Sequence, residues 1–187
     1  MHWVRTIVVV ALVASGVVAS PEEQRHVSLV PWKILAPTDA VNAPLTLFWI
    51  PDSAAAMRRS PLLTSDELTR FSARCVAMRV VRLDDDVRLA RLGVDGELPV
   101  AVLADRNGRV IGSVSGDDVA DVEDLVRDEL DTRTFQADSM IDAARRHANA
   151  GRRDAAMALY REVWEARCLC PRQGKLAGKA LKKLERR

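Results

Sequence analysis

The sequence predicts an α/β protein: a mixed central sheet of four or five strands flanked by helices, with a helical extension after it. Between residues 44 and 134, short β-branched apolar runs alternate with segments of helical period. Helices separate the early runs, which indicates parallel pairing, whereas Asn107-Gly108 between two later runs indicates an antiparallel hairpin. After residue 137 only helical periodicity remains.

The first elements follow from local signals. The run PLTLFWI at 44–50 predicts a buried strand, and the segment after it predicts a helix that contains Pro61. Ser65 or Thr64 is placed to cap the next helix, and Asp66 and Glu67 suit its positive N-terminal end. Residues 76–83 predict the second strand.

The second half of the sheet is predicted in the same way. A short helix over 84–92 is closed by Gly93. The hairpin strands are 100–104 and 109–115, and an amphipathic helix over 117–130 follows. Residues 27–35 are predicted to add an edge strand, since Pro31 argues against a central position.

The C-terminal part is predicted to be helical and basic. Two amphipathic segments, 139–150 and 154–168, are split by Gly151, and a third helix covers 176–187. Residues 40–136 hold 12 Lys and Arg against 17 Asp and Glu, whereas residues 137–187 hold 13 against 6. A solvated face explains the basic tail, as does docking on the acidic middle, an acidic protein or a membrane surface. Nucleic acid is not expected as a partner of an exported protein.

Residues 1–19 are predicted to be a secretory signal peptide. A positive start precedes an uncharged run over 6–18, which is shorter than the roughly 20 residues that span a bilayer. The chain from residue 20 is then expected in an oxidising compartment, either periplasmic or secreted. The alternative is an uncleaved anchor, which is the only membrane attachment expected.

The order of elements and four local motifs resemble the thioredoxin fold over residues 44–131. In that family a strand ending in Phe-Trp leads into Cys-x-x-Cys at a helix start, with a proline five residues later. Here Phe48-Trp49 precedes the turn and Pro61 stands at the matching place. Leu98-Pro99 resembles the family's cis-proline, Asp105 to Val110 its hairpin, and Gly116 the glycine before its last helix. The resemblance divides the chain into residues 20–43, a thioredoxin-like domain at 44–134 and the extension at 137–187.

The departures from that family all concern its redox chemistry. Ser53 and Ala56 stand where the family has its two cysteines, and Leu47 replaces its buried acid. Disulfide exchange requires a thiolate, and a serine without a neighbouring base does not supply an equivalent nucleophile. Activity as a dithiol–disulfide oxidoreductase at this position is therefore not expected. Ser53 is instead predicted to cap its helix; a hydrogen bond to a glutathione-type thiol ligand is the alternative.

A peptide groove is the principal binding site that the resemblance implies. In the family, the residue before the cis-proline pairs its backbone with an extended peptide, a mode that needs no cysteine. Leu98 and Pro99 occupy those positions, and Trp49, Ile50 and Pro51 are predicted to form an apolar rim. The alternative is that these side chains pack inward.

Three cysteines complete the candidates. Cys168 and Cys170 are a candidate disulfide or displaced redox pair, and the alternative is two cysteines with no shared chemistry. A metal site with His147 is the weaker interpretation because too few ligands are present. Cys75 is predicted to be a small core residue. The extension also resembles one tetratricopeptide-type hairpin through Ala144, Gly151, Ala156 and Tyr160.

We therefore expect an exported, redox-inactive binding or scaffolding module for a protein or peptide partner, more a binding protein than an enzyme, with no cofactor and no metal. The alternatives are a redox protein using Cys168 and Cys170, and a thiol-ligand enzyme using Ser53.

Overall fold

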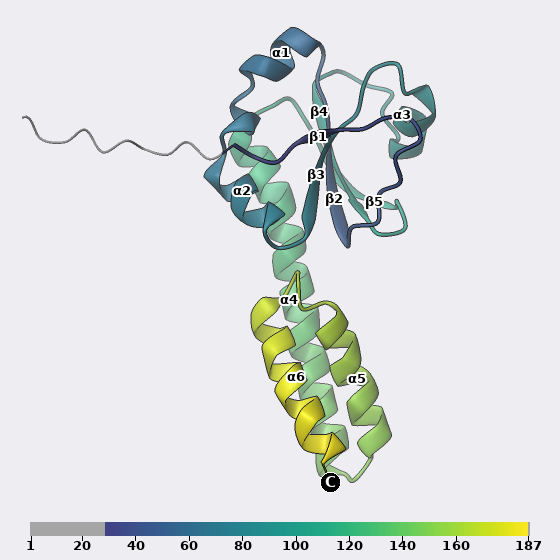
Figure 1. Ribbon diagram of the computed structural model, residues 1–187, viewed down its shortest axis with the longest axis vertical. Helices are drawn as coiled ribbons and strands as arrows, with labels where there is room; N and C mark the ends of the chain where they lie inside the picture. Colours follow the sequence, from purple (N-terminus) through teal and green to yellow (C-terminus); the bar gives the residue numbers. More distant parts are fainter. Residues whose placement is uncertain (1–28, 187) are drawn as a thin grey trace, which may run out of the picture.

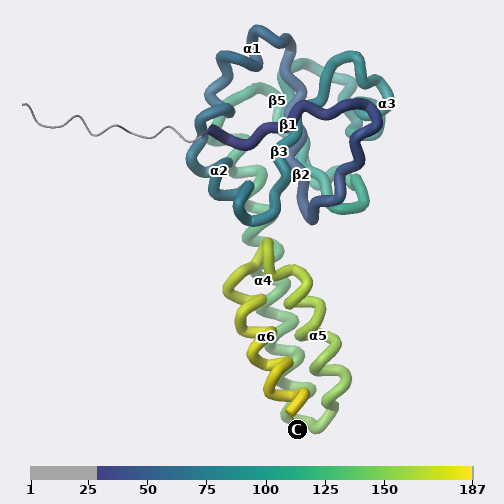
Figure 2. Tube along the Cα trace, in the orientation of Figure 1, coloured from purple at the N-terminus to yellow at the C-terminus, as the bar shows by residue number. Residues whose placement is uncertain are grey.

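The computed structural model describes residues 29–186. The predicted signal peptide lies outside the described residues. The molecule is elongated, with an α/β part at one end and a bundle of three helices at the other (Figures 1 and 2).

Five strands form one mixed sheet in the order β1-β3-β2-β4-β5. Strand β3 pairs in parallel with β1 and β2, and β4 pairs antiparallel with β2 and β5. The predicted mixed sheet is confirmed, including the edge position of the strand within 27–35. The strands are β1 (Lys33–Ile34), β2 (Leu45–Ile50), β3 (Val76–Val80), β4 (Val100–Asp105) and β5 (Val110–Ser115).

Helices cover both faces of the sheet. The central strand β2 is buried along its whole length, and its side chains alternate between the two faces. Leu47 and Trp49 pack in the cluster that includes residues of α2 and α4, whereas Phe48 and Ile50 pack in the cluster that includes Leu92 of α3. The helices of the α/β part are α1 (Ala54–Arg59), η1 (Pro61–Leu63), α2 (Asp66–Ser72) and α3 (Asp86–Leu92).

One 31-residue helix, α4 (Val119–Asn149), joins the sheet to the bundle. The prediction of two separate helices here is wrong, because no Gly or Pro interrupts residues 117–149 and the buried face continues through the junction. Val122 and Val126 pack against the sheet, and Ile141 and Ala144 pack in the bundle as part of the same core. The predicted boundary between 134 and 137 therefore falls inside a helix.

The bundle is completed by α5 (Arg153–Glu165) and α6 (Pro171–Glu185). Helix α6 begins five residues before the predicted 176, since Pro171 suits the first turn of a helix. Pro61 also differs from its prediction. Helix α1 ends at Arg59, and Ser60 caps a 3-10 turn that begins with Pro61.

A disulfide between Cys75 and Cys168 fastens the bundle to the α/β part. The two Cα atoms are 5.8 Å apart and the cysteines are 93 residues apart in sequence. Beside this bond, the Arg74 guanidinium donates to the Leu169 carbonyl at 3.2 and 2.6 Å. The α2–β3 turn is thus held to the α5–α6 loop by a covalent bond and a forked hydrogen bond.

This pairing corrects two predictions about cysteines. Cys168 does not pair with Cys170, because Cys170 is turned into the bundle core with 1% exposure and keeps a free thiol. Cys75 is not a plain core residue either. It adopts φ 61° in the turn before β3, a left-handed conformation that is unfavourable for a residue with a side chain.

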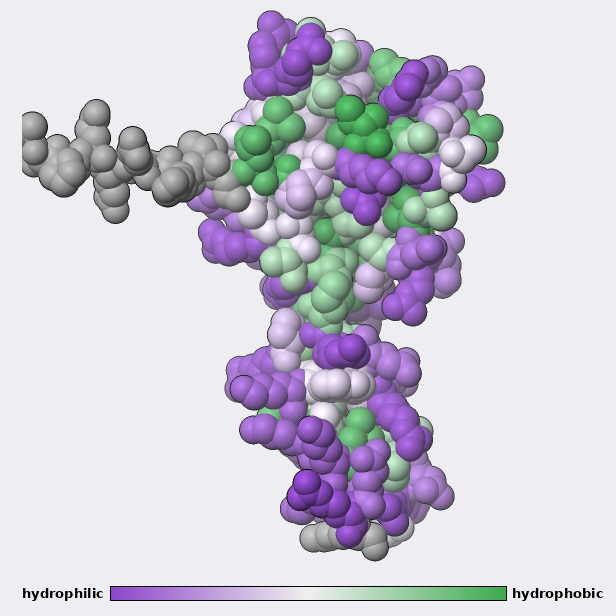
Figure 3. Space-filling view, viewed as in Figure 1, coloured by the Kyte–Doolittle hydropathy of each residue, from purple (hydrophilic) through white to green (hydrophobic). Residues whose placement is uncertain are grey.

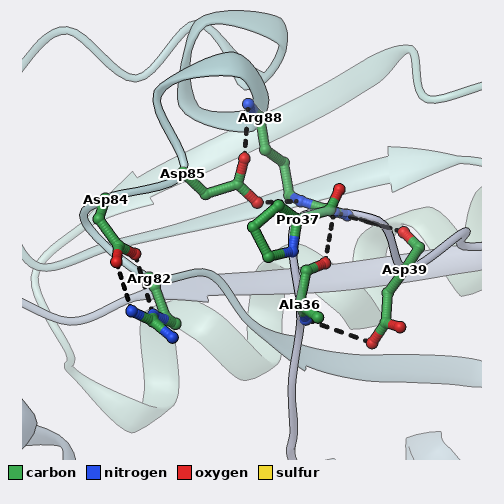
Figure 4. A network of polar contacts seen from close by, with 7 residues as sticks. All are labelled: Ala36, Pro37, Asp39, Arg82, Asp84, Asp85 and Arg88. Carbon is green, nitrogen blue, oxygen red and sulfur yellow. Dashed lines mark hydrogen bonds and ion pairs between the residues drawn. The ribbon is translucent and has the colours of Figure 1, made fainter.

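Arg88 of α3 fixes the loop between β1 and β2 (Figure 4). Its Nε donates to Asp85 at 2.8 Å, and its terminal nitrogen donates to the carbonyls of Ala36 and Pro37 at 3.1 and 3.2 Å. Asp85 also caps α3 by accepting from the Arg88 amide at 3.2 Å. The hydrogen bond from Arg88 holds the pKa of Asp85 below its ordinary value, against the opposing effect of desolvation.

The lowered pKa of Asp85 predicts how the free energy of unfolding changes with pH in acid. A carboxyl group whose pKa falls on folding stabilises the fold above its unfolded-state pKa of about 3.9, and this contribution is lost as pH decreases through the folded value. We expect the unfolding free energy of Asp85→Asn, measured in urea, to be lower than that of the wild type at pH 7. The difference should narrow below about pH 4, since Asn keeps the helix cap but not the charge.

Asp84→Asn is the matched control, because Asp84 forms an exposed pair with Arg82. Exposed pairs contribute little, so the control should follow the wild type. A constant difference between wild type and Asp85→Asn at every pH would contradict the role of the charge.

Candidate functional site

The candidate site lies where the parallel strands reach their carboxyl ends. Trp49 of β2 and Ile34 of β1 are both in register with Val80 of β3, and Ile50 is in register with Val100 at the start of β4. Four segments therefore meet at this end of the sheet, namely those that follow β1, β2 and β3 and the one that precedes β4. Open α/β sheets bind their ligands outside the carboxyl ends of their strands.

Ser53 caps α1, as predicted. Its backbone is extended, with φ −159°, and its Oγ accepts from the Ala56 amide at 3.1 Å. No His, Asp or Glu side chain in residues 29–186 hydrogen-bonds Ser53, so the serine has no base to activate it. Alanine is the residue that best favours a helix, and none of the α1 residues is buried. The alanines thus sustain a short surface helix. The hydrogen bond from Ser53 to a thiol ligand stays a prediction.

The Leu98–Pro99 peptide bond is cis. It directly precedes β4, and the Pro99 carbonyl accepts from the Gly116 amide at 2.7 Å. Leu98 and Pro99 are half-buried. Within residues 29–186 the backbone N–H and C=O of Leu98 have no backbone partner.

The rim predicted from Trp49 and Ile50 is wrong. Their exposed fractions are 1% and 0%, because β2 is the middle strand and both of its faces are covered. The Trp49 ring packs on Trp32 with centroids 5.4 Å apart, and its buried indole Nε1 has no hydrogen-bond partner among the described residues. Pro51 is also buried, although it lies among the residues that line an apolar groove.

An apolar groove of about 470 Å³ lies at the carboxyl end of the parallel strands. Its walls come from β1, from the start of α1 and from the loop between β3 and α3. Ile34 and Leu83 are its most exposed apolar side chains, at 52% and 44%. The exposed Arg82–Asp84 pair is its charged boundary. The apolar residues that line it are Ile34, Pro51, Ala54, Met57, Val80, Val81 and Leu83.

The space-filling view agrees with this distribution. Apolar surface gathers on the α/β part, and the bundle presents mainly hydrophilic side chains (Figure 3). Sequence reasoning found Pro51 and Ser53 but missed Ile34 and Leu83. The signal for Ile34 was its place in a predicted edge strand, whose outer side is open by definition.

The cysteines of the bundle do not add a second reactive site to this edge. Cys75 precedes β3 and the groove follows it, so the disulfide lies at the opposite end of that strand, about 17 Å away. His147 does not meet Cys168 and Cys170 in a metal site; residues 29–186 contain no group of three potential metal-ligating side chains. No helix in that range has the length and apolar composition needed to cross a bilayer.

No protein-family model matches the chain, and no curated protein sequence is similar to it. A function for this chain is therefore inferred from the groove and the residues around it.

Proposed function

We propose that this chain is an exported thioredoxin-like protein that has lost its redox centre and binds an extended apolar peptide segment. Four features support the thioredoxin-like fold: the strand order, a capped helix directly after β2, a cis-proline before β4 and a long helix after β5. The disulfide supports export, because such bonds persist in oxidising compartments.

The residues at the position of the family's redox centre support the loss of thiol chemistry. Ser53 and Ala56 occupy the positions of the two cysteines, and Leu47 at the position of the buried acid is 0% exposed. A carboxylate there would be desolvated without a thiol to serve. The fold around this position is thus retained, and the reactive thiol is missing from it.

The groove is the single observation on which the binding proposal depends. It is largely apolar and open to solvent, and Leu98, whose backbone groups have no backbone partner among residues 29–186, precedes β4 at the same end of the sheet without lining the groove. A peptide strand can satisfy such backbone groups while its side chains enter an adjoining apolar groove. Ile34, Ala54 and Leu83 are the exposed side chains that we assign to contact it.

The bundle completes the proposal as an attachment or scaffolding element. Ala144, Ala156 and Tyr160 are buried, and Gly151 between the helices adopts φ 73°. These features support the resemblance to a single tetratricopeptide-type hairpin, in which small residues allow two helices to approach.

Photo-crosslinking from two adjacent positions tests the groove. Ala54 lines the groove and Ala55 is exposed on the same helix without lining it. A benzophenone amino acid at position 54 is expected to form adducts with extended apolar peptides, at least about tenfold more than at position 55. Leu83→Asp should abolish the adducts, since a carboxylate in the groove would be desolvated.

Two results would count against the proposal. Equal capture from positions 54 and 55 would remove the groove as the binding site. Reduction of insulin by dithiothreitol, catalysed by the wild-type protein well above background, would contradict the loss of redox function.

A further inference from the structure

Two exposed stripes of opposite charge run along α4 and α6. In each stripe the residues are spaced by three and four, and the first and last lie 14 positions apart, which is about 21 Å of helix. The acidic stripe consists of Asp121, Asp124, Asp128 and Asp131 and ends in Phe135. The basic stripe consists of Arg172, Lys175, Lys179, Lys182 and Arg186.

Both stripes face away from the core of their own chain. On α4 the buried positions Val122, Val126 and Leu130 occupy the opposite side of the helix, and on α6 Ala177 and Leu181 do the same. Within residues 29–186 only Asp124 among the stripe residues forms an ion pair, with Arg127 of its own helix. The basic face therefore does not dock on the acidic half of α4 within one chain.

An apolar feature stands at one end of each stripe. Phe135 is 74% exposed at the C-terminal end of the acidic stripe. Near the start of α6, Trp164 is 41% exposed and borders a groove of about 340 Å³ with Pro171 and Gly178. A side chain at position 178 would press on this ring at 2.8 Å, so the glycine keeps the groove open.

We propose that two copies of this chain associate through these stripes, the acidic stripe of each lying along the basic stripe of the other. Within one chain α4 and α6 run in the same direction (Figure 1), since α5 reverses the chain between them. A two-fold axis perpendicular to the helices therefore sets α6 of one copy antiparallel to α4 of its partner. The same contact then forms twice, as a closed dimer requires.

The antiparallel register fits both the charges and the apolar ends. With Asp121 opposite Arg186, Asp128 meets Lys179, and Phe135 meets the partner's α6 at its first turn. That turn borders the groove beside Trp164. A parallel register would leave Phe135 opposite Arg186, at the far end of α6 from the groove beside Trp164. Phe135 and Trp164 form the apolar centre that gives such a charged contact its affinity.

An anionic membrane is the main competing occupant of the basic stripe. Trp164 beside lysines suits a lipid surface as well. The matching acidic stripe and the exposed Phe135 have no role at such a surface, whereas a second copy accounts for both.

Sedimentation velocity on the purified protein tests the proposal. We expect a dimer at about 50 mM salt that weakens at least tenfold at about 500 mM, because exposed charge pairs are screened. Asp124→Lys with Asp128→Lys, and separately Lys179→Glu with Lys182→Glu, should each weaken the dimer by at least about a hundredfold through like-charge contacts.

An equimolar mixture of the two double variants gives the sharpest result. In the mixture, one contact joins the unaltered acidic stripe of one variant to the unaltered basic stripe of the other. The second contact joins the two substituted stretches, whose charges are reversed on both sides and so are again opposite. A heterodimer is therefore expected, although neither variant pairs well with itself. Asp52→Lys with Asp95→Lys changes the net charge as the first double variant does, at exposed sites outside the stripes, and should remain dimeric. Phe135→Ser should weaken the dimer about tenfold with an unchanged circular dichroism spectrum.

A wild type that stays monomeric at low salt overturns the proposal, as does a mixture that does not associate. Flotation with vesicles of phosphatidylcholine and phosphatidylglycerol is the parallel measurement. A monomeric wild type that binds these vesicles through Lys179 and Lys182 would assign the basic stripe to a membrane instead.

Discussion

Replacing both Cys75 and Cys168 with Ser is expected to lower the free energy of unfolding by about 4 kcal/mol. The bond closes a loop across a sequence separation of 93 residues, and a crosslink over so long a loop restricts the unfolded chain strongly. Chemical denaturation of the double variant, with and without dithiothreitol, measures the effect. The wild type should lose the same stability when reduced.

Two control variants separate the bond from its surroundings. Cys170→Ala removes a buried thiol and keeps the bond, so it should cost about 1 kcal/mol or less. Starting from Cys168→Ser, Cys75→Gly should recover about 1 kcal/mol relative to Cys75→Ala, because glycine accepts the left-handed φ of 61°. A wild type that is insensitive to dithiothreitol would show that the bond does not form.

The second large effect concerns Gly174 of α6. Its ideal Cβ would lie 2.7 Å from the Cα atom of Arg167, where the loop crosses the helix. Gly174→Ala should therefore destabilise the protein by about 2 kcal/mol through overpacking, although alanine alone favours a helix by up to about 1 kcal/mol. The midpoint of thermal unfolding measures the change.

Gly178→Ala is its control on the same helix. There the added methyl group meets the ring of Trp164, a half-exposed side chain that can turn aside, rather than backbone. Its effect should be close to zero, because the gain in helix propensity offsets the adjustment. Equal losses in the two variants would contradict the account of a close backbone approach at Gly174.

The fold was predictable because its signals are local. The apolar run of β2, the cap of α2 and the Gly93 terminus each depend on a few neighbouring residues, and all three are found in place. The Cys75–Cys168 pairing carried no such signal, since it depends on how two distant turns approach. The continuity of α4 was not predicted, because the polar segment between its two amphipathic halves resembles a loop when only a narrow face of the helix is buried.

The site was predictable only in part, for a related reason. Ser53 as a cap follows from its position before a helix. The exposure of Trp49 and Ile50 depended on whether β2 lay at the edge or the centre of the sheet. The groove collects Ile34, Pro51 and Leu83 from three separate segments, and only the parallel register of β1, β2 and β3 brings them together.

The unbroken helix α4 also fixes the distance between the sheet and the far end of the bundle. At 31 residues it is about 46 Å long, and no flexible linker intervenes between the sheet and the far end of the bundle. The disulfide and the Arg74 fork add a second point of attachment, which prevents rotation about the helix axis. A partner bound at the end of the bundle would therefore stand at a set distance and a set angle from a peptide in the groove.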